Sequence, residues 1–493
     1  MYKVNFDLAA SARKEMVQDG FAPDFPPGTE EQLASVKAKP APAVDSAADH
    51  SIRDLRNLLW SSIDNDTSRD LDQIEVAERV ANGIRVLVGI ADVDFDVPAG
   101  SPIDQHAAQE TVTVYTAVHN FPMLPEVLST DLTSLAENQD RLAVVIEFVV
   151  DSGGLIASST IYRAVVRNKA QLAYNAVGAW LEGRSGPDAK VAASAELQAQ
   201  LKLQDEAAVK LRAQRHRLGA LNFDRVEAVA TISDGHVSDV TAAQKTRAND
   251  LIEDFMVAAN EVMARTLKES GTSSIRRVVK TPERWPRIVE LAAKYGTSLP
   301  ANPDAGALGA FLESRHKADP DHYADISLAI VKLMGPGEYV MSKAGETGEG
   351  HFGLAAQDYT HSTAPNRRYA DLVTQRLIKA LLSKTAAPYS DSDLEAIARN
   401  CTAKEDAARK VERVMAKRVA AVAMQGRVGQ HFQAIVTGVT PKGTFVRLLD
   451  PPVEGILWKG QQGADVGDKF DVTLTSTNPE RGYLDFARWL SYN

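Results

Sequence analysis

Alternating and clustered apolar residues mark three segments in the first third of the chain as β-strands. They are residues 84–91 (IRVLVGIA), 111–115 (TVTVY) and 142–150 (LAVVIEFVV). β-Branched residues are frequent in these runs, as they are in buried strands. Residues from about 51 to 170 are therefore predicted to form mainly β-structure.

Helical spacing dominates the middle and later parts of the chain. A run rich in Ala, Gln, Lys, Leu and Glu over residues 190–215 predicts one helix, and residues 246–268 predict a longer one. The longer run has apolar residues three and four apart, which predicts a face packed on the core. These residues are Leu251, Phe255, Ala258, Ala259 and Val262. Helices are also predicted over residues 370–382 and 392–424.

Both ends of the chain differ from this body. Residues 1–36 are predicted to form a short helical arm interrupted by Pro-Pro-Gly, and the Ala- and Pro-rich residues 37–49 a linker. After Gly426, five short β-rich runs alternate with Gly, Pro and Asn-Pro turns within about sixty-five residues. This spacing predicts a small closed β-barrel.

Length and charge narrow the class of protein. At 493 residues the chain is longer than one hydrophobic core usually supports, so two or three domains are expected. A net charge of −10 confines any nucleic-acid contact to a local basic channel.

Cysteine content and hydropathy bear on the compartment. The single cysteine, Cys401, excludes an intramolecular disulfide and fits a reducing compartment, and its helical, charged surroundings favour a structural role. The first residues lack the apolar core of a signal peptide, and residues 142–150 are too few to span a bilayer. We therefore expect a cytoplasmic protein that does not act in a membrane.

The densest chemical signal is acidic. Asp64, Asp66, Asp70 and Asp72 fall within nine positions of the segment SSIDNDTSRDLDQIE, residues 61–75. Carboxylates this close repel one another, so a folded chain keeps them together where cations or solvent relieve the repulsion. Mg²⁺ takes oxygen ligands from a few carboxylates, waters and substrate phosphates. For this segment alone, a solvated acidic loop is the simpler interpretation; the other motifs favour a metal site.

Five further segments accompany the acidic one. They are IADVDFDVPAGSPIDQHA (90–107), VYTAVHNFPMLPEVLSTDLTSL (114–135), AQLAYNAV (170–177), LIEDFMVAAN (251–260) and HFGLAAQDYTHSTAPNRRYADL (351–372). With these motifs in this order, the chain resembles the ribonuclease II / ribonuclease R family of processive 3′→5′ exoribonucleases. The likeness runs from about residue 54 to 382 and continues into the terminal barrel.

The resemblance implies an α+β fold in three parts. Residues 51–424 would form an RNB catalytic domain, a mixed sheet surrounded by helices, and residues 425–493 an OB-fold RNA-binding domain. Residues 1–50 would be the helical arm and linker, without the two cold-shock domains that usually precede the catalytic domain. This difference predicts a more open RNA entrance; alternatively, the arm is a dimerisation or partner element.

The resemblance also implies hydrolysis of single-stranded RNA, or of RNA with a 3′ overhang, to nucleoside 5′-monophosphates. Two-metal catalysis by Mg²⁺, with Mn²⁺ as an alternative, would use Asp64, Asp70 and Asp72 as catalytic metal ligands. Arg367 has a planar guanidinium suited to a phosphate oxygen as charge builds in the transition state.

One position of the metal cluster departs from the family pattern. Gln73 stands where the family has a fourth aspartate. Its amide oxygen can hold a metal-bound water but contributes no charge, with Asp66 and Glu75 as nearby acids that would compensate. We expect an active enzyme with a raised Mg²⁺ requirement.

Aromatic residues are expected to stack on RNA bases, each with a simpler alternative. Tyr115 and Tyr174 fit this role, the alternative being half-buried strand positions. In the terminal barrel, Phe445 and Trp458 are candidates, although Phe432 and Phe445 suit the barrel core equally well.

Charged residues offer further RNA contacts. Glu253 would accept a hydrogen bond from a ribose 2′-hydroxyl, or form an ion pair on a helix surface. Arg368 would bind phosphate, or pair with a neighbouring acid such as Asp371. His351 and His361 are expected to be structural, because the metal mechanism needs no histidine base.

Other functions remain open. A catalytically weak or inactive RNA-binding protein of the same fold would use the degenerate acidic cluster only structurally; the presence of both Asp72 and Arg367 argues against it. A deoxyribonuclease or dual-specificity nuclease would share the two-metal chemistry, and a phosphatase of the Asp-x-Asp type leaves the long flanking motifs unexplained.

Overall fold

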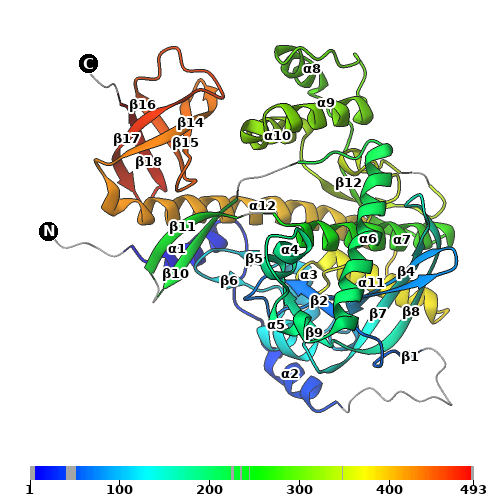
Figure 1. The fold of residues 1–493 in the computed structure, drawn as a ribbon. Coiled ribbons are helices and arrows are strands. Elements are labelled where there is room, and N and C mark those ends of the chain that lie inside the picture. Colours follow the sequence, from blue (N-terminus) through cyan, green and yellow to red (C-terminus); the bar gives the residue numbers. More distant parts are fainter. Residues whose placement is uncertain are drawn as a thin grey trace.

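A seven-stranded sheet forms the centre of the larger body, with strand order β1-β8-β7-β4-β3-β2-β9 (Figure 1). This computed structural model describes residues 6–39, 52–223, 227–233, 236–243, 245–346 and 348–489. The strands pair antiparallel, except that β1 runs parallel to β8 and β2 parallel to β9. The strands are β1 (Ile52–Asp54), β2 (Ser61–Asp64), β3 (Gln73–Val80), β4 (Gly83–Ala91), β7 (Asp140–Val150), β8 (Ile156–Arg167) and β9 (Ala170–Ala173).

Two long helices pack together over this sheet. Helix α6 (Ala195–Arg217) lies on β3, β4 and β7, and α7 (Arg247–Glu269) packs against α6. The five apolar residues predicted to form the core face of α7 are all buried, which confirms that prediction. Shorter helices flank them: α3 (Pro102–Glu110), α4 (Tyr174–Leu181), α5 (Ala189–Ala192) and α11 (Tyr369–Leu382).

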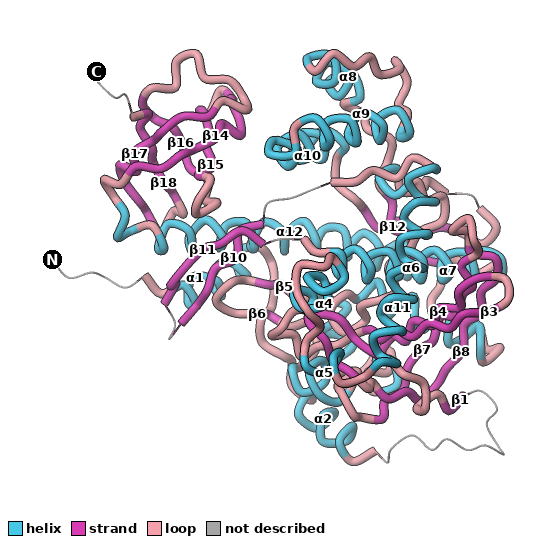
Figure 2. The backbone as a smooth tube through the Cα atoms, viewed as in Figure 1, coloured by secondary structure: helices cyan, strands magenta, loops and turns pink. Residues whose placement is uncertain are grey.

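Helix α12 (Asp391–Ala423) connects the sheet domain to the terminal barrel (Figure 2). Helix α1 (Leu8–Gln18) packs along it, so the predicted helical arm lies against its own chain. Helix α2 (Thr29–Lys37) packs against α3. The predicted linker, residues 37–49, falls mostly outside the described residues.

The terminal strands close into a five-stranded barrel, as the turn spacing predicts. Its order is β14-β15-β16-β18-β17, and its core is separate from that of the sheet domain. The strands are β14 (His431–Thr440), β15 (Gly443–Leu448), β16 (Glu454–Lys459), β17 (Lys469–Asn478) and β18 (Tyr483–Arg488).

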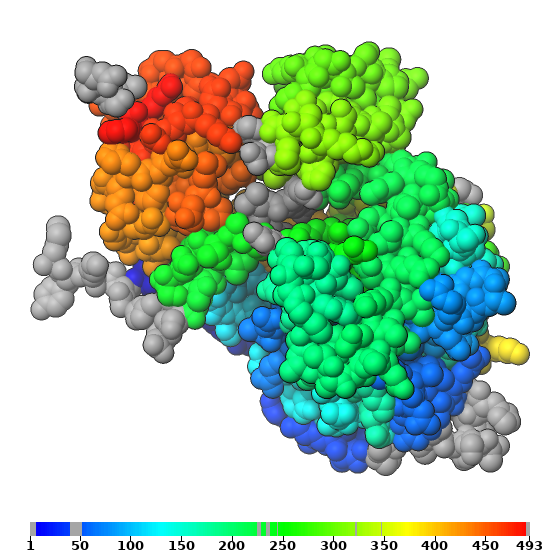
Figure 3. All heavy atoms as spheres, in the orientation of Figure 1, coloured from blue at the N-terminus to red at the C-terminus, as the bar shows by residue number. Residues whose placement is uncertain are grey.

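Several elements were not predicted. A helical module made of α8 (Trp285–Lys294), α9 (Ala305–Ala318) and α10 (Pro320–Met334) has its own small core and lies beside the barrel in the space-filling view (Figure 3). The module and the barrel are linked by an ion pair of 2.9 Å between Arg447 and Asp325. Two antiparallel strand pairs were also not predicted: β10 (Glu227–Ser233) with β11 (His236–Ala243), and β12 (Ser274–Val278) with β13 (Glu338–Ser342), between which the helical module lies in the sequence. There are also short helical segments: η1 (Val93–Phe95), η3 (Phe352–Leu354) and η4 (Gln425–Arg427) are 3-10 helices, and η2 (Leu128–Leu132) is a π-helix.

The predicted strand over residues 111–115 is wrong for most of its length. Only β5 (Val114–Tyr115) forms, paired with β6 (Asn120–Phe121). Thr111 ends helix α3 with a left-handed φ of 61°, which no strand residue adopts. Among the described residues, no helix combines the length and the apolar character that a membrane crossing requires.

Candidate active site

The acidic cluster lies at the edge of the sheet where β2 and β9 end. These strands run parallel with Asp64 opposite Ala173, so Asp64 and Tyr174, the first residue of α4, leave the sheet side by side. Strand β3 begins at the same edge because it pairs antiparallel with β2. The loop of residues 65–72 therefore holds the remaining aspartates beside Asp64.

Local hydrogen bonds shape this loop. The Asp64 Oδ1 accepts the Asn65 N–H at 2.7 Å and the Ser68 hydroxyl at 2.8 Å, which turns the chain sharply after β2. Further along, the Leu71 N–H donates to the Ser134 hydroxyl at 3.2 Å. The loop is thus fixed to the segment that follows η2.

Asp72 is buried opposite an arginine from a distant part of the chain. Its Oδ1 accepts the Asn366 N–H at 3.2 Å, and its Oδ2 lies 3.6 Å from the Arg367 Nε. Burial raises the pKa of Asp72 to about 7, while the positive charge of Arg367 opposes that rise. The Arg367 side chain is 43% exposed, so the guanidinium is both paired and accessible from outside.

Residues 111–115 carry Tyr115 into the same site. The Thr113 N–H donates to the Arg367 carbonyl at 3.0 Å. The Tyr115 hydroxyl donates to Asp70 at 3.2 Å, and its N–H donates to Glu412 of α12 at 3.1 Å. Asp64, Asp70, Asp72, Arg367, Tyr115 and Tyr174 thus come together from distant parts of the sequence.

The carboxylate charge of Asp70 repels those of Asp64 and Asp72. Burial raises the pKa of Asp64, and the charge of Asp70 raises it further. The same charge raises the pKa of Asp72. Asp70 therefore lies within electrostatic range of both, and a bound cation would relieve the repulsion.

The donor set fits a hard divalent cation that also uses water and substrate. Over the described ranges, no group of three or more His, Cys, Asp or Glu side chains is placed to hold an ion by itself. Mg²⁺ commonly takes only one or two carboxylates and completes its shell with waters and phosphate oxygens. Asp64, Asp70 and Asp72 suit that mode rather than a cage built from protein alone. Asp66 is exposed on the loop, whereas Gln73 is half-buried at the start of β3.

The adjacent arginines have different surroundings. Arg368 donates two hydrogen bonds to Asp371, from Nε at 2.8 Å and from Nη2 at 2.7 Å. This geometry matches the ion-pair alternative for Arg368, because both donors on one side of the guanidinium are already used. Of the two arginines, Arg367 therefore has the guanidinium that is more available to a ligand.

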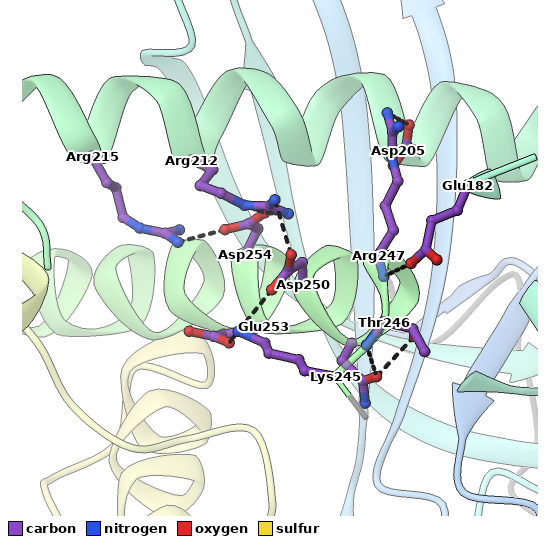
Figure 4. A network of polar contacts seen from close by, with 11 residues as sticks. Glu182, Asp205, Arg212, Arg215, Lys245, Thr246, Arg247, Asp250, Glu253 and Asp254 are labelled. Atoms are coloured by element: carbon purple, nitrogen blue, oxygen red, sulfur yellow. Dashed lines mark hydrogen bonds and ion pairs between the residues drawn. The ribbon is translucent and has the colours of Figure 1, made fainter. Parts of the chain in front are cut away.

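Glu253 also has a basic partner. Its side chain is 51% exposed on α7 and accepts from the Lys245 Nζ at 2.8 Å (Figure 4). The neighbouring Asp254 is buried and pairs with Arg212 and Arg215 of α6, at 2.7 and 2.5 Å. This network joins the two helices, and the surface ion pair weighed for Glu253 is formed.

The barrel aromatics divide by exposure. Trp458 is 54% exposed on β16, and its Nε1–H donates to Thr475 at 2.9 Å. Phe445 is half-buried, whereas Phe432 belongs to the barrel core. Tyr115 is partly exposed and Tyr174 half-buried, and burial raises the pKa of both phenols.

The two histidines of the last motif, His351 and His361, and the cysteine, Cys401, occupy structural positions. Burial lowers the pKa of His361, whose Nδ1 lies 2.8 Å from the Tyr339 hydroxyl. His351 caps η3 by accepting the Leu354 N–H, and burial lowers its pKa to about 4. Burial raises the pKa of Cys401 to about 12, so this thiol stays protonated.

Sequence analysis assigned no role to two residues whose hydrogen bonds support the site, Asn366 and Gln375. The Asn366 Oδ1 accepts the Thr133 hydroxyl at 2.7 Å. The Gln375 Nε2 donates to the Ala91 carbonyl at 2.8 Å, and its Oε1 accepts the Asp94 N–H at 3.1 Å. The signal for Gln375 was present in the sequence, as a neutral amide within the largely apolar helix α11.

Two domain families match the chain, and their limits agree with its division into a sheet domain and a terminal barrel. The chain belongs to the RNB family: the RNB domain matches residues 52–384. The RNase II-type exonuclease C-terminal S1 domain matches residues 430–489. The predicted family and fold class are confirmed.

Relatives of known name are ribonucleases R. Ribonuclease R 1 of Lactococcus lactis is 31% identical over 415 residues, covering 82% of this chain and 49% of that protein. Ribonuclease R of Escherichia coli is 28% identical over 505 residues, covering 94% of this chain and 60% of that protein. The chain thus spans about half the length of the curated relatives it matches.

Solved structures share the fold at low sequence identity. Mycoplasma genitalium RNase R in complex with ribose-methylated single-stranded RNA has a TM-score of 0.87 and 22% identity, covering 98% of this chain and 78% of that one. Yeast Ssd1, described as a pseudonuclease, has a TM-score of 0.72 and 18% identity, covering 94% of this chain and 58% of that one. The fold therefore occurs both in a ribonuclease and in a pseudonuclease.

Proposed function

We propose that this chain is a Mg²⁺-dependent 3′→5′ exoribonuclease that hydrolyses single-stranded RNA to nucleoside 5′-monophosphates. The observation that carries the proposal is the approach of Arg367 to Asp72 beside Asp64 and Asp70. An accessible guanidinium next to one buried and two half-buried carboxylates suits a phosphodiester held between cations and arginine. Family membership and relatives named ribonuclease R support the same reaction.

In this proposal, Asp64, Asp70 and Asp72 hold the divalent cations, with Mn²⁺ as an alternative to Mg²⁺. Bound there, the cations would polarise the phosphate and lower the pKa of a water. Arg367 binds a non-bridging phosphate oxygen, and Asp72 orients its guanidinium. The Tyr115 hydroxyl keeps Asp70 in place by its hydrogen bond.

Aromatic side chains would guide the RNA. Tyr115 and Tyr174 flank the acidic cluster and offer stacking faces for bases near the 3′ end, while the exposed Trp458 offers another on the barrel. Mycoplasma genitalium RNase R has been solved with single-stranded and with double-stranded RNA. We propose single-stranded RNA, or RNA with a 3′ overhang, as the substrate here, and the cytoplasm as the compartment.

A second candidate is an RNA-binding protein of the same fold with little or no activity. The neutral Gln73 favours it, because the cluster lacks one carboxylate of the family pattern. The existence of a pseudonuclease with a similar fold gives it a structural precedent.

A time course on 5′-labelled single-stranded RNA separates the two candidates. The reactions contain Mg²⁺, EDTA, or Mg²⁺ with the Asp72→Asn variant. Shortening from the 3′ end that requires the metal and is lost in the variant is expected. RNA binding without shortening at any Mg²⁺ or Mn²⁺ concentration would contradict the exonuclease and favour the second candidate.

A further inference from the structure

Glu75 is a fully buried carboxylate on β3, the strand that begins at the acidic cluster. Its side chain has no exposed surface, and neither Oε1 nor Oε2 has a hydrogen-bond partner among the described residues. Within the same ranges, no lysine, arginine or histidine forms an ion pair with it; the ion pairs of β3 involve Glu78 and Arg79 on its exposed part. An ionised carboxylate in such a place needs a cation or a proton to balance it.

Its position on β3 relates it to the missing acid. Residues two apart on a strand point to the same face, so Glu75 shares a face with Gln73, one step deeper into the domain. The charge of Asp64 acts on Glu75, and the charges of Asp64 and Glu75 both act on the Tyr174 phenol. Glu75 therefore approaches the cluster from the side of Asp64.

The surroundings of Glu75 are polar on one side. The Gln204 Nε2 of α6 lies 3.4 Å from the Glu75 carbonyl and 3.5 Å from the Ser61 hydroxyl. The Gln204 Oε1 also has no partner among the described residues. Three side-chain oxygens with unused hydrogen-bonding capacity thus lie in one buried region, which is rare in a folded protein unless water or an ion fills it.

We propose that Glu75 supplies the carboxylate that Gln73 does not, as a direct or water-mediated ligand of the divalent cation held by Asp64. The proposal rests on the cation site of the proposed function and adds a ligand from within the domain. A hard cation accepts this oxygen donor. The charge lost at position 73 is restored at position 75, so the site keeps four acidic groups.

Titration calorimetry with Mn²⁺ on metal-free protein tests this proposal without measuring RNA cleavage. The variants are Glu75→Gln, Glu78→Gln and the double variant Glu75→Gln with Gln73→Asp. Glu78 is the matched control, because it lies on the same strand, is exposed and pairs with Arg85. We expect Glu75→Gln to weaken Mn²⁺ binding by about 10- to 100-fold, as loss of a group supporting a metal site does. Glu78→Gln should bind as the parent does, and the double variant should regain affinity.

Thermal melting gives a second readout. Mn²⁺ should raise the melting temperature of Glu75→Gln less than that of the parent, because a protein that binds the ion more weakly gains less stability from it. If Glu75→Gln does not fold, Glu75→Asp keeps the charge on a shorter side chain and should still bind Mn²⁺ more weakly than Glu78→Gln.

Unchanged Mn²⁺ binding in Glu75→Gln would overturn the proposal and leave Glu75 a structural residue of the core. Mn²⁺ binding that is weakened by Glu75→Gln and not restored by adding Gln73→Asp would overturn the claim that the carboxylate at position 75 replaces one at position 73. A Glu75-dependent binding curve in a protein that does not cleave RNA would support the ligand and contradict the exonuclease. RNA cleavage together with Mn²⁺ binding that does not depend on Glu75 would support the exonuclease and contradict Glu75 as a ligand.

Discussion

The Asp72 carboxylate lies 3.6 Å from the Arg367 guanidinium, while its Oδ1 accepts the N–H of the preceding residue, Asn366. The chain therefore positions Arg367 twice, through its side chain and through the backbone next to it. This arrangement keeps the guanidinium at the cluster yet leaves it 43% exposed. A group meant only to neutralise Asp72 would gain from deeper burial, so the exposure suits a group that also binds a ligand.

Arg367→Lys should lower the rate of RNA cleavage by about 100- to 1,000-fold, as removal of one transition-state donor does. Lysine keeps the charge but lacks the planar fork that can bind Asp72 and phosphate together. Single-turnover rates on 5′-labelled RNA measure the effect, and RNA affinity should change far less. A variant within threefold of the parent rate would show that Arg367 does not act on the reacting phosphate.

Arg368→Met should instead affect stability, because it leaves Asp371 buried without its ion-pair partner. Breaking a buried pair in this way costs about 3–5 kcal/mol in the free energy of unfolding. Urea denaturation of the metal-free protein measures it. Arg399→Met is the matched control: Arg399 pairs with Glu395 on the exposed face of α12 and should cost at most about 1 kcal/mol. Equal losses in the two variants would contradict this distinction.

Sequence patterns predicted the elements whose cause is local. The core face of α7 follows from apolar residues three and four apart, and the barrel follows from short β-runs between turns. The partner of Arg367 did not follow, because Asp72 lies in a distant segment, whereas the pairing of Arg368 with its neighbour Asp371 was one of the alternatives that the sequence offered. Arg367 and Arg368 are adjacent and chemically identical, yet one faces Asp72 and the other Asp371. The predicted strand over residues 111–115 was wrong at Thr111 because this residue ends helix α3 and takes a left-handed backbone conformation there.

Met16→Ala should destabilise the protein by about 2–5 kcal/mol, the usual cost of removing a large buried side chain. Met16 of α1 is buried in a cluster that includes Met415 of α12, and Lys410 forms an ion pair with Asp19 at the end of α1. The adjacent Val17 is 59% exposed, so Val17→Ala is the control and should change stability by less than about 0.5 kcal/mol. Urea denaturation compares the two. A small effect at both positions would show that the arm does not stabilise the fold.

His351 should make the protein less stable as the pH falls below about 6.5, the ordinary pKa of an unfolded histidine. Burial, with the charge of Arg277, lowers the pKa of His351 to about 4 in the folded chain. The unfolded chain therefore binds a proton that the folded chain does not, and the loss in the free energy of unfolding is about 1.4 kcal/mol per pH unit between these values.

His351→Asn removes the titration and keeps an acceptor for the Leu354 N–H, because asparagine caps helices well. Urea denaturation at pH 7.5 and 5.5 should show a loss in the parent about 1 kcal/mol larger than in the variant. Buried carboxylates with raised pKa values act in the opposite direction, but both proteins share them and the difference removes them. Equal losses in parent and variant would mean that His351 is already protonated in the folded protein.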